Sequence, residues 1–249
     1  MKRLGIIDWG IGGVSVYELI KEQIGDVPVT YFSDTGVTPY GKMARKELVS
    51  RLDFVTEYLK DRGVTHLVIG CNAASTAIPH LADHGIPILG VIAPAVEMTA
   101  RIKPKRLGII GGRRTVVSGV YRDAFAKRGI KPNQRVAQPL SGLIESGDVS
   151  SAKLHDEARR ILAPLRGHSH ILLACTHYPA ITQVLRSYVS PSTKFIDPAS
   201  ALLKKIKKWH LDIGSGAEEF LTTGDPSAMK RAARLAFGVT LPNSRRVRI

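Results

Sequence analysis

The two cysteines of this chain, Cys71 and Cys175, each follow an apolar run, "HLVIGC" and "HILLAC". A thiol can act as an acid or a base when a neighbouring group stabilises its thiolate. His177 lies two residues beyond Cys175 and could do this, while Asp8, at the end of the first apolar run, could hydrogen-bond or relay a proton near Cys71. Two thiols on opposite walls of a cleft could remove a proton from one face of a carbon and deliver a proton to the other. These residue types suit inversion of a carbon centre.

An internal repeat indicates how the two cysteines could come to face each other. The hexapeptide "KRLGII" begins at residue 2 and again at residue 105, an offset of 103, and the two cysteine-bearing runs are offset by 104 residues. Two matches at nearly one offset predict two similar domains of ordinary size. If these domains face each other across a cleft, Cys71 and Cys175 occupy equivalent positions on opposite walls.

The pattern of each half is typical of an α/β fold. Short β-branched runs such as "VTYFSD" alternate with amphipathic stretches, of which "RKELVSRLDFVTEYLKDRG" has buried-type residues at helical spacing (Leu48, Leu52, Val55 and Leu59) and a C-cap glycine at Gly63. Alternating strands and helices predict parallel sheets, which bind ligands beyond the carboxyl ends of their strands. We expect two pseudo-symmetric open parallel-sheet domains facing across a cleft, the first formed by residues 1–94 and about 205–249 and the second by 95–204. The late segment "GAEEFLTTGDPSAMKRAARLAFG" predicts a strand or turn and then a helix that returns to the first half.

Composition limits the classes of function. The chain has 249 residues, 44% of them hydrophobic, and no segment approaches the roughly 18 apolar residues of a membrane span. Two cysteines without a secretory signal predict a cytoplasmic protein without disulfides or membrane contact. The net charge of +15 would suit nucleic acid or the steering of small anions. Because no nucleic-acid-binding signature accompanies it, we interpret it as a solvated basic face and do not expect a nucleic-acid partner.

Three further stretches lie where strands should empty into loops. "DWGIGG" (8–13) lacks dinucleotide-binding spacing, but a glycine-rich turn before a helix could hold a carboxylate on its amides. "TPYGK" (38–42) is either a surface turn or a ligand clamp. "GGRRTVVSG" (111–119) could offer Thr115 and backbone amides to an anion, with Arg113 and Arg114 simply solvated.

Together these stretches resemble the cofactor-independent aspartate/glutamate racemase superfamily, and most closely its glutamate-specific members. The matches to the family pattern are "DWGIGG", Pro39-Tyr40-Gly41, Cys71-Asn72-Ala73 and the intact Cys175-Thr176-His177-Tyr178-Pro179, and the likeness extends from residue 4 to about 237. Where the family has serine and threonine, this chain has Trp9 and Ala73. Losing two polar contacts of about 0.5–1.5 kcal/mol each would weaken glutamate binding roughly tenfold or more.

The resemblance implies a role for each matching residue. Cys71 and Cys175 would be the paired acid and base, assisted by Asp8 and His177. The substrate-binding set would be Trp9, Pro39, Tyr40, Gly41, Asn72, Ala73, Thr115, Glu145 and Thr176, with Glu145 in a supporting role. The family chemistry implies no metal and no cofactor, a small acidic amino acid as substrate, a possible homodimer, and a role in supplying D-glutamate for peptidoglycan of the cell wall.

Two alternatives stay open at this stage. Trp9 and Ala73 could reshape the pocket for another amino or carboxylic acid. The chain could also be a non-catalytic binding or regulatory relative that uses its basic surface, although such a protein has no evident need of both thiols and His177.

Overall fold

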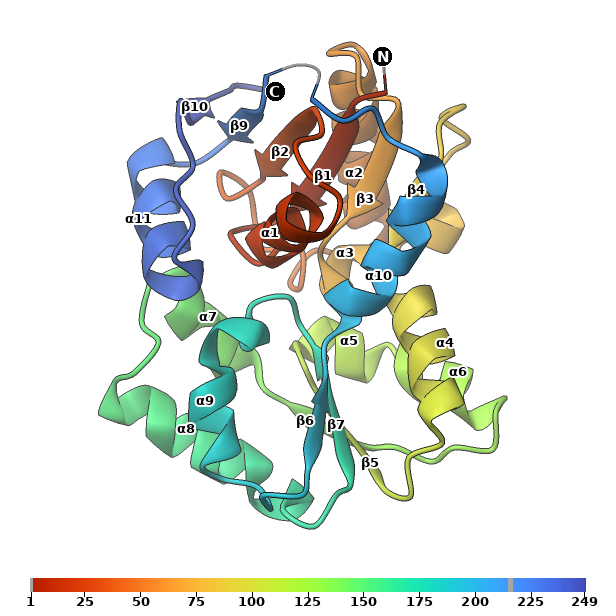
Figure 1. Cartoon of the computed structure of the whole chain (residues 1–249), viewed down its shortest axis with the longest axis vertical. Helices are drawn as coiled ribbons and strands as arrows, with labels where there is room; N and C mark the ends of the chain where they lie inside the picture. Colours follow the sequence, from red (N-terminus) through yellow and green to blue (C-terminus); the bar gives the residue numbers. More distant parts are fainter. Residues whose placement is uncertain (1, 215–216) are drawn as a thin grey trace.

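The computed structural model describes residues 2–214 and 217–249, which form two parallel β-sheets surrounded by helices (Figure 1). The larger sheet has the order β10-β9-β2-β1-β3-β4, with strands β1 (Leu4–Asp8), β2 (Val29–Ser33), β3 (His66–Ile69), β4 (Ile88–Gly90), β9 (Glu219–Thr222) and β10 (Arg245–Arg246). The smaller sheet has the order β6-β5-β7-β8, with strands β5 (Leu107–Gly111), β6 (Asn133–Val136), β7 (His170–Ala174) and β8 (Lys194–Ile196). The expected α/β class with two parallel sheets is confirmed.

The internal repeat corresponds to a repeated strand order. The order β2-β1-β3-β4 in the first half has its counterpart in β6-β5-β7-β8, and "KRLGII" contributes to the central strand of each sheet. In each half the chain moves from the central strand to one neighbour and then crosses to the other side. This reversal creates a switch point, where the loops after two adjacent strands diverge and leave a crevice. Asp8 and Cys71 flank the crevice of the first half, and Gly111 and Cys175 flank that of the second.

Helices cover both sheets. They are α1 (Val14–Gln23), α2 (Arg45–Lys60), α3 (Asn72–Ser75), α4 (Ile92–Ile102), α5 (Arg113–Val117), α6 (Val120–Ala126), α7 (Gln138–Glu145), α8 (Ala152–Leu162), α9 (Thr182–Arg186), α10 (Pro198–Ile206) and α11 (Pro226–Phe237), with 3-10 turns η1 (Ile78–His80), η2 (Ala163–Leu165), η3 (Tyr178–Ile181) and η4 (Lys207–Trp209). In α2 the four residues predicted at helical spacing are fully buried, and Gly63 has a φ of +83° beyond the helix end. That helix prediction is confirmed.

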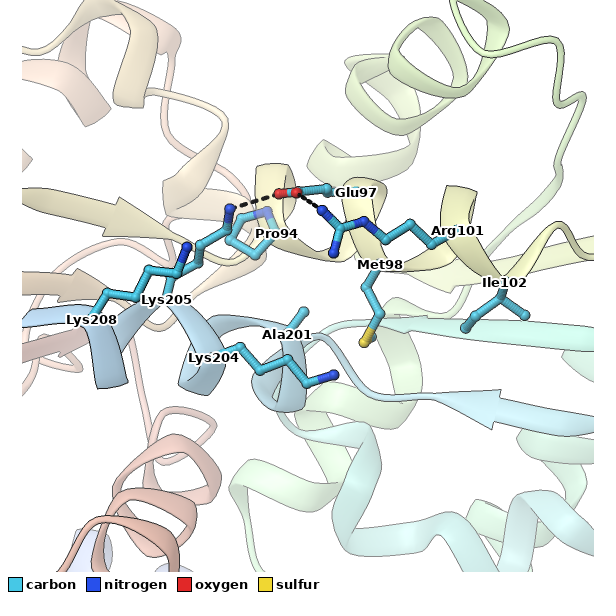
Figure 2. A pocket seen from close by; sticks show the side chains of 9 residues that line it. All are labelled: Pro94, Glu97, Met98, Arg101, Ile102, Ala201, Lys204, Lys205 and Lys208. Atoms are coloured by element: carbon cyan, nitrogen blue, oxygen red, sulfur yellow. Dashed lines mark hydrogen bonds and ion pairs between the residues drawn. The ribbon is translucent and has the colours of Figure 1, made fainter.

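The chain passes between the two sheets twice, through α4 and through α10, and these helices pack on each other. Figure 2 shows the groove between them, where Glu97 of α4 pairs with Arg101 on its own helix at 2.6 Å and with Lys205 of α10 at 2.7 Å. The domain limits expected near residues 94 and 204 fall within α4 and α10, and a continuous helix does not mark where one domain ends and the next begins. These limits stay a prediction. The returning segment forms β9 beside β2 and then α11, as expected, although its first residue, Gly216, lies outside the described residues.

A buried histidine joins α2 to the loop before β4. His84 contacts Glu57 at 2.5 Å through Nδ1 and Asp53 at 2.8 Å through Nε2. Burial on its own would lower the pKa of His84, but the two carboxylates outweigh it and raise the pKa above its ordinary value. The histidine therefore bonds this loop to α2 most strongly when it is protonated.

No helix in the described ranges, 2–214 and 217–249, combines the length and apolar character needed to cross a membrane.

Candidate active site

A pocket of about 360 Å³ lies between the two halves, at the carboxyl ends of the central strands. All thirteen residues predicted for the site line it: Asp8, Trp9, Pro39, Tyr40, Gly41, Cys71, Asn72, Ala73, Thr115, Glu145, Cys175, Thr176 and His177. The volume is in the range of small-molecule sites. The two halves therefore bring the predicted residues together into one cavity.

The two thiols reach this pocket from equivalent strand ends. Cys71 follows β3 and caps the N-terminus of α3, and Cys175 follows β7 directly. Both cysteines are free and half-buried. Since β3 and β7 occupy matching places in the two sheets, the pocket receives one thiol from each half.

His177 connects Cys175 to a carboxylate. Its Nδ1 lies 3.5 Å from the Sγ of Cys175, and its Nε2 lies 2.7 Å from the Oε2 of Glu145 at the end of α7. A protonated imidazole has two N–H donors and can satisfy both partners at once. The row of thiol, imidazole and carboxylate can therefore hold Cys175 as a thiolate beside an imidazolium.

The charges around the two thiols differ. Burial alone would lower the pKa of His177, but Cys175 and Glu145 outweigh it and hold that pKa well above its ordinary value. Burial raises the pKa of the Cys71 thiol well above its usual range, and the nearby Asp8 carboxylate raises it further. At neutral pH this favours a neutral thiol at Cys71 facing the Cys175–His177 pair.

Asp8 is almost completely buried and holds two donors. The Trp9 backbone N–H donates to its Oδ1 at 2.6 Å, and the Thr176 hydroxyl donates to its Oδ2 at 3.0 Å. Burial raises the pKa of Asp8, while positive charge on His177 opposes that shift. The Thr176 bond also joins the first half to the second beside the thiols.

The glycines of "DWGIGG" make room for residues of the other half. A Cβ atom on Gly10 would lie 2.0 Å from the Oε2 of Glu145, and one on Gly12 would lie 2.4 Å from the Thr176 hydroxyl. The next amide, that of Ile11, donates to Oε2 of Glu145 at 3.0 Å. The turn does hold a carboxylate on an amide, as the sequence favoured, but that carboxylate belongs to the protein.

Among the residues predicted to bind substrate, Asn72 has the clearest free group. It is 3% exposed, and its Oδ1 accepts a hydrogen bond from the Tyr121 hydroxyl of α6 at 2.8 Å. Its Nδ2 is buried and has no hydrogen-bond partner within the described structure. A buried donor without a partner is costly, and a ligand oxygen in the pocket would satisfy it. Tyr121 comes from the second half, so it orients this amide from across the cleft.

Three predicted binding side chains already have protein partners for their polar atoms. The Tyr40 hydroxyl donates to the buried Asp34 at 2.7 Å, the Thr176 hydroxyl donates to Asp8, and the Trp9 indole N–H donates to the Val37 carbonyl at 3.1 Å. Tyr40 and Trp9 can therefore offer a ligand the surfaces of their rings, and all three residues can offer main-chain groups. Trp9, which stands where the family has a serine, is therefore among the residues that line the pocket.

Sequence reasoning missed six lining residues: Lys42, Gly112, Gln138, Ser141, Gly142 and Ala174. Lys42 and Gly112 lie inside the stretches "TPYGK" and "GGRRTVVSG", and Ala174 precedes Cys175. Gln138, Ser141 and Gly142 share the α7 face that carries Glu145, so the helical spacing before Glu145 was the available signal. Gln138 accepts the Arg113 backbone N–H at 3.0 Å and thereby joins α7 to α5.

The reading of Arg114 as a solvated side chain is wrong. Its Nε donates to the Tyr40 carbonyl at 3.0 Å, and its Nη2 contacts the Met43 carbonyl. Arg114 is half-buried, whereas Arg113 is exposed. The guanidinium thus connects α5 of the second half to a turn of the first half at the edge of the pocket.

This chain is similar to known proteins over nearly its whole length. The Asp/Glu/Hydantoin racemase family model matches residues 4–206. The chain is similar to the glutamate racemase of Aquifex aeolicus, with 31% identity over 95% of this chain and 94% of that protein. Among solved structures it is similar to glutamate racemase RacE1 of Bacillus anthracis (TM-score 0.88, 24% identity, 100% of this chain and 98% of the other). It is also similar to glutamate racemase of Thermus thermophilus in complex with beta-chloro-D-alanine (TM-score 0.85, 26% identity, 99% and 96%).

Proposed function

The chain belongs to the Asp/Glu/hydantoin racemase family, and from this premise we propose that it interconverts L- and D-glutamate by proton transfer between two thiols and the substrate Cα. The observation that carries the proposal is the pair of free cysteines, Cys71 and Cys175, which line one pocket from equivalent strand ends of the two halves. The same residues would serve both directions of the reaction.

In the first step, the Cys175 thiolate removes the Cα proton from the enantiomer whose C–H bond faces it. The electron pair left on carbon is delocalised into the adjacent carboxylate group. The Cys71 thiol then delivers its proton to the opposite face, which completes the inversion. Afterwards Cys175 is a thiol and Cys71 a thiolate, and this form of the protein converts the other enantiomer by the same steps in reverse.

His177 and Glu145 support this chemistry by stabilising the Cys175 thiolate before the reaction. A thiolate beside an imidazolium is the form that accepts a proton, and Glu145 at 2.7 Å stabilises the charge on the ring. Asp8 acts on the other thiol, since its carboxylate favours the protonated state of Cys71. The two walls are thus prepared for opposite tasks.

The pocket also offers groups that recognise an acidic amino acid. The Nδ2 of Asn72 can donate to a carboxylate, and Thr115 contributes a buried hydroxyl from the second half. Lys42 lies exposed at the pocket edge and supplies positive charge for a second carboxylate. The chain's net charge of +15 would attract glutamate, which carries a net negative charge at neutral pH, from solution.

The test follows loss of the Cα proton by NMR in heavy water, with separate L- and D-glutamate and a panel of other amino acids. The wild-type chain should exchange and invert both enantiomers of glutamate. Cys71→Ser and Cys175→Ser should each lower racemisation by about 10²–10⁴-fold, the usual contribution of an acid or base. Each variant keeps one thiol and serves as the other's control, so residual exchange without inversion should favour opposite enantiomers in the two.

Exchange by the wild-type chain with another acid and not with glutamate would move the substrate while keeping the mechanism. Racemisation that survives either substitution at the wild-type rate would contradict the two-thiol mechanism. A homodimer and a cytoplasmic location belong to the same proposal, and sedimentation of the purified chain measures the first directly.

A further inference from the structure

At the edge of the pocket, Arg114 contacts the turn formed by residues 39–43. The arginine belongs to α5 of the second half, and its donors meet the main-chain carbonyls of Tyr40 and Met43 in the first half. This turn supplies Pro39, Tyr40, Gly41 and Lys42 to the pocket wall. A side chain of one half therefore holds part of the wall contributed by the other.

The turn is anchored differently on its two sides. Toward the first half, the Tyr40 hydroxyl donates to Asp34, which also receives two hydrogen bonds from Arg51 at 2.7 and 2.8 Å. Asp34 is completely buried, so this anchor is a charged and desolvated network. Toward the second half, the turn is held through its carbonyls by Arg114.

The contact across the cleft is of a kind that can break and form again. Its acceptors are neutral carbonyls, and no acidic side chain within the described residues pairs with Arg114. Hydrogen bonds to neutral acceptors are weaker than charge-assisted pairs with a carboxylate. Burial lowers the pKa of Arg114, and the like charge of Arg45 lowers it further. The charged guanidinium is therefore less stable in this contact than it would be in solvent.

We propose that Arg114 is a positioning residue that latches the 39–43 turn over the pocket, and that substrate entry and product release require this latch to open. The inference rests on the proposed racemisation for its role in turnover. The latch itself is a property of the free protein and can be measured without any substrate.

The test compares Arg114→Met with Arg113→Met in the full-length chain. Methionine keeps much of the apolar stem but removes the donors, and the neighbouring Arg113 is exposed with no side-chain bond across the cleft. Hydrogen–deuterium exchange of the peptide spanning residues 37–46 should be about tenfold faster or more in Arg114→Met than in wild type, and unchanged in Arg113→Met. Arg114→Lys, which retains one donor group, should fall between them.

Steady-state kinetics supply the second measurement. Arg114→Met should raise KM for both glutamate enantiomers about tenfold while kcat changes less than about threefold, because the latch shapes the wall and does not transfer protons. Equal rates of hydrogen–deuterium exchange of the 37–46 peptide in the three variants and wild type would refute the latch, whatever the substrate is. Faster exchange with unchanged KM and kcat would overturn its role in turnover. A wild-type chain inactive toward glutamate would refute the proposed function, while the exchange data still decide whether the latch exists.

Discussion

Replacing Glu145 with glutamine tests whether the row of carboxylate, imidazole and thiol controls the reaction. The Oε2 atom of Glu145 lies 2.7 Å from the Nε2 of His177 and accepts the Ile11 amide at 3.0 Å. Glutamine keeps an oxygen at nearly the same place but removes the negative charge. The expected result is a less stable imidazolium at His177 and therefore a less stable thiolate at Cys175.

The magnitude follows from the change in the type of hydrogen bond. A bond to a charged group contributes about 1.5–3 kcal/mol, and a neutral one about 0.5–1.5 kcal/mol. Loss of roughly 1.4 kcal/mol corresponds to a tenfold change in an equilibrium constant. Glu145→Gln should therefore lower kcat/KM for glutamate about tenfold. The loss must be the same in both directions, because two enantiomers have equal free energies and the ratio of the two kcat/KM values is fixed.

The assay is the pH dependence of kcat/KM, followed by polarimetry or circular dichroism in both directions. The active form needs His177 protonated, so activity is lost as the pH rises through the His177 pKa. Since Glu145 helps to raise that pKa, its neutralisation should move the high-pH limb of the profile to lower pH.

A matched control is Glu157→Gln, which removes a half-buried carboxylate, outside the pocket, that pairs with Arg160 on α8. This control should leave both rate and profile unchanged. If Glu145→Gln kept the wild-type rate and the same high-pH limb, Glu145 would not act on His177. Another group would then have to stabilise the Cys175 thiolate.

Three further substitutions test other parts of the structure. Tyr121→Phe should raise KM about tenfold with a smaller effect on kcat, because Asn72 loses the bond that orients its free amide, and steady-state kinetics would show this. Gly10→Ala should reduce activity at least tenfold by displacing Glu145, as measured by the exchange assay. His84→Gln should lower the melting temperature more at pH 6 than at pH 9: the raised pKa means that the stabilisation is complete below the unfolded-state pKa and is lost as pH rises through the folded-state pKa.

The first two of these substitutions have matched control variants. Tyr188→Phe removes a hydroxyl that contacts His155, away from the pocket, and should leave KM unchanged. Gly167→Ala adds a Cβ atom no closer than 3.4 Å to its neighbours and should be tolerated. A melting temperature of His84→Gln that differs from wild type by the same amount at both pH values would exclude the protonated histidine as the source of stability.

The main features of the fold could be predicted because they depend on local pattern and repetition. The repeat of "KRLGII" predicted two similar halves, and the two copies form β1 and β5 at the centres of their sheets. The helix over 45–60 followed from the spacing of Leu48 and the apolar residues after it. Parallel strands place their carboxyl ends at one edge of a sheet, and this rule, applied to each half of the repeat, put Cys71 and Cys175 at equivalent edges of the two sheets.

What the sequence could not supply is the identity of partners across the cleft. Nothing near Gly10 indicates that Glu145, more than a hundred residues later, occupies the space where its side chain would lie. The same is true of Arg114, whose neighbour Arg113 has the same side chain but remains in solvent. Such contacts depend on the relative position of two halves, which no local periodicity encodes.

The double crossing through α4 and α10 constrains how the pocket can open. A single connection would let one half swing or twist in many directions, but two adjacent packed helices act as parallel struts. Of the two ion pairs that Glu97 forms, the one with Lys205 joins α4 to α10, and the one with Arg101 lies within α4 (Figure 2). Bending about this pair of helices would leave the packing between them in place, whereas sliding or twisting one half against the other would disrupt it.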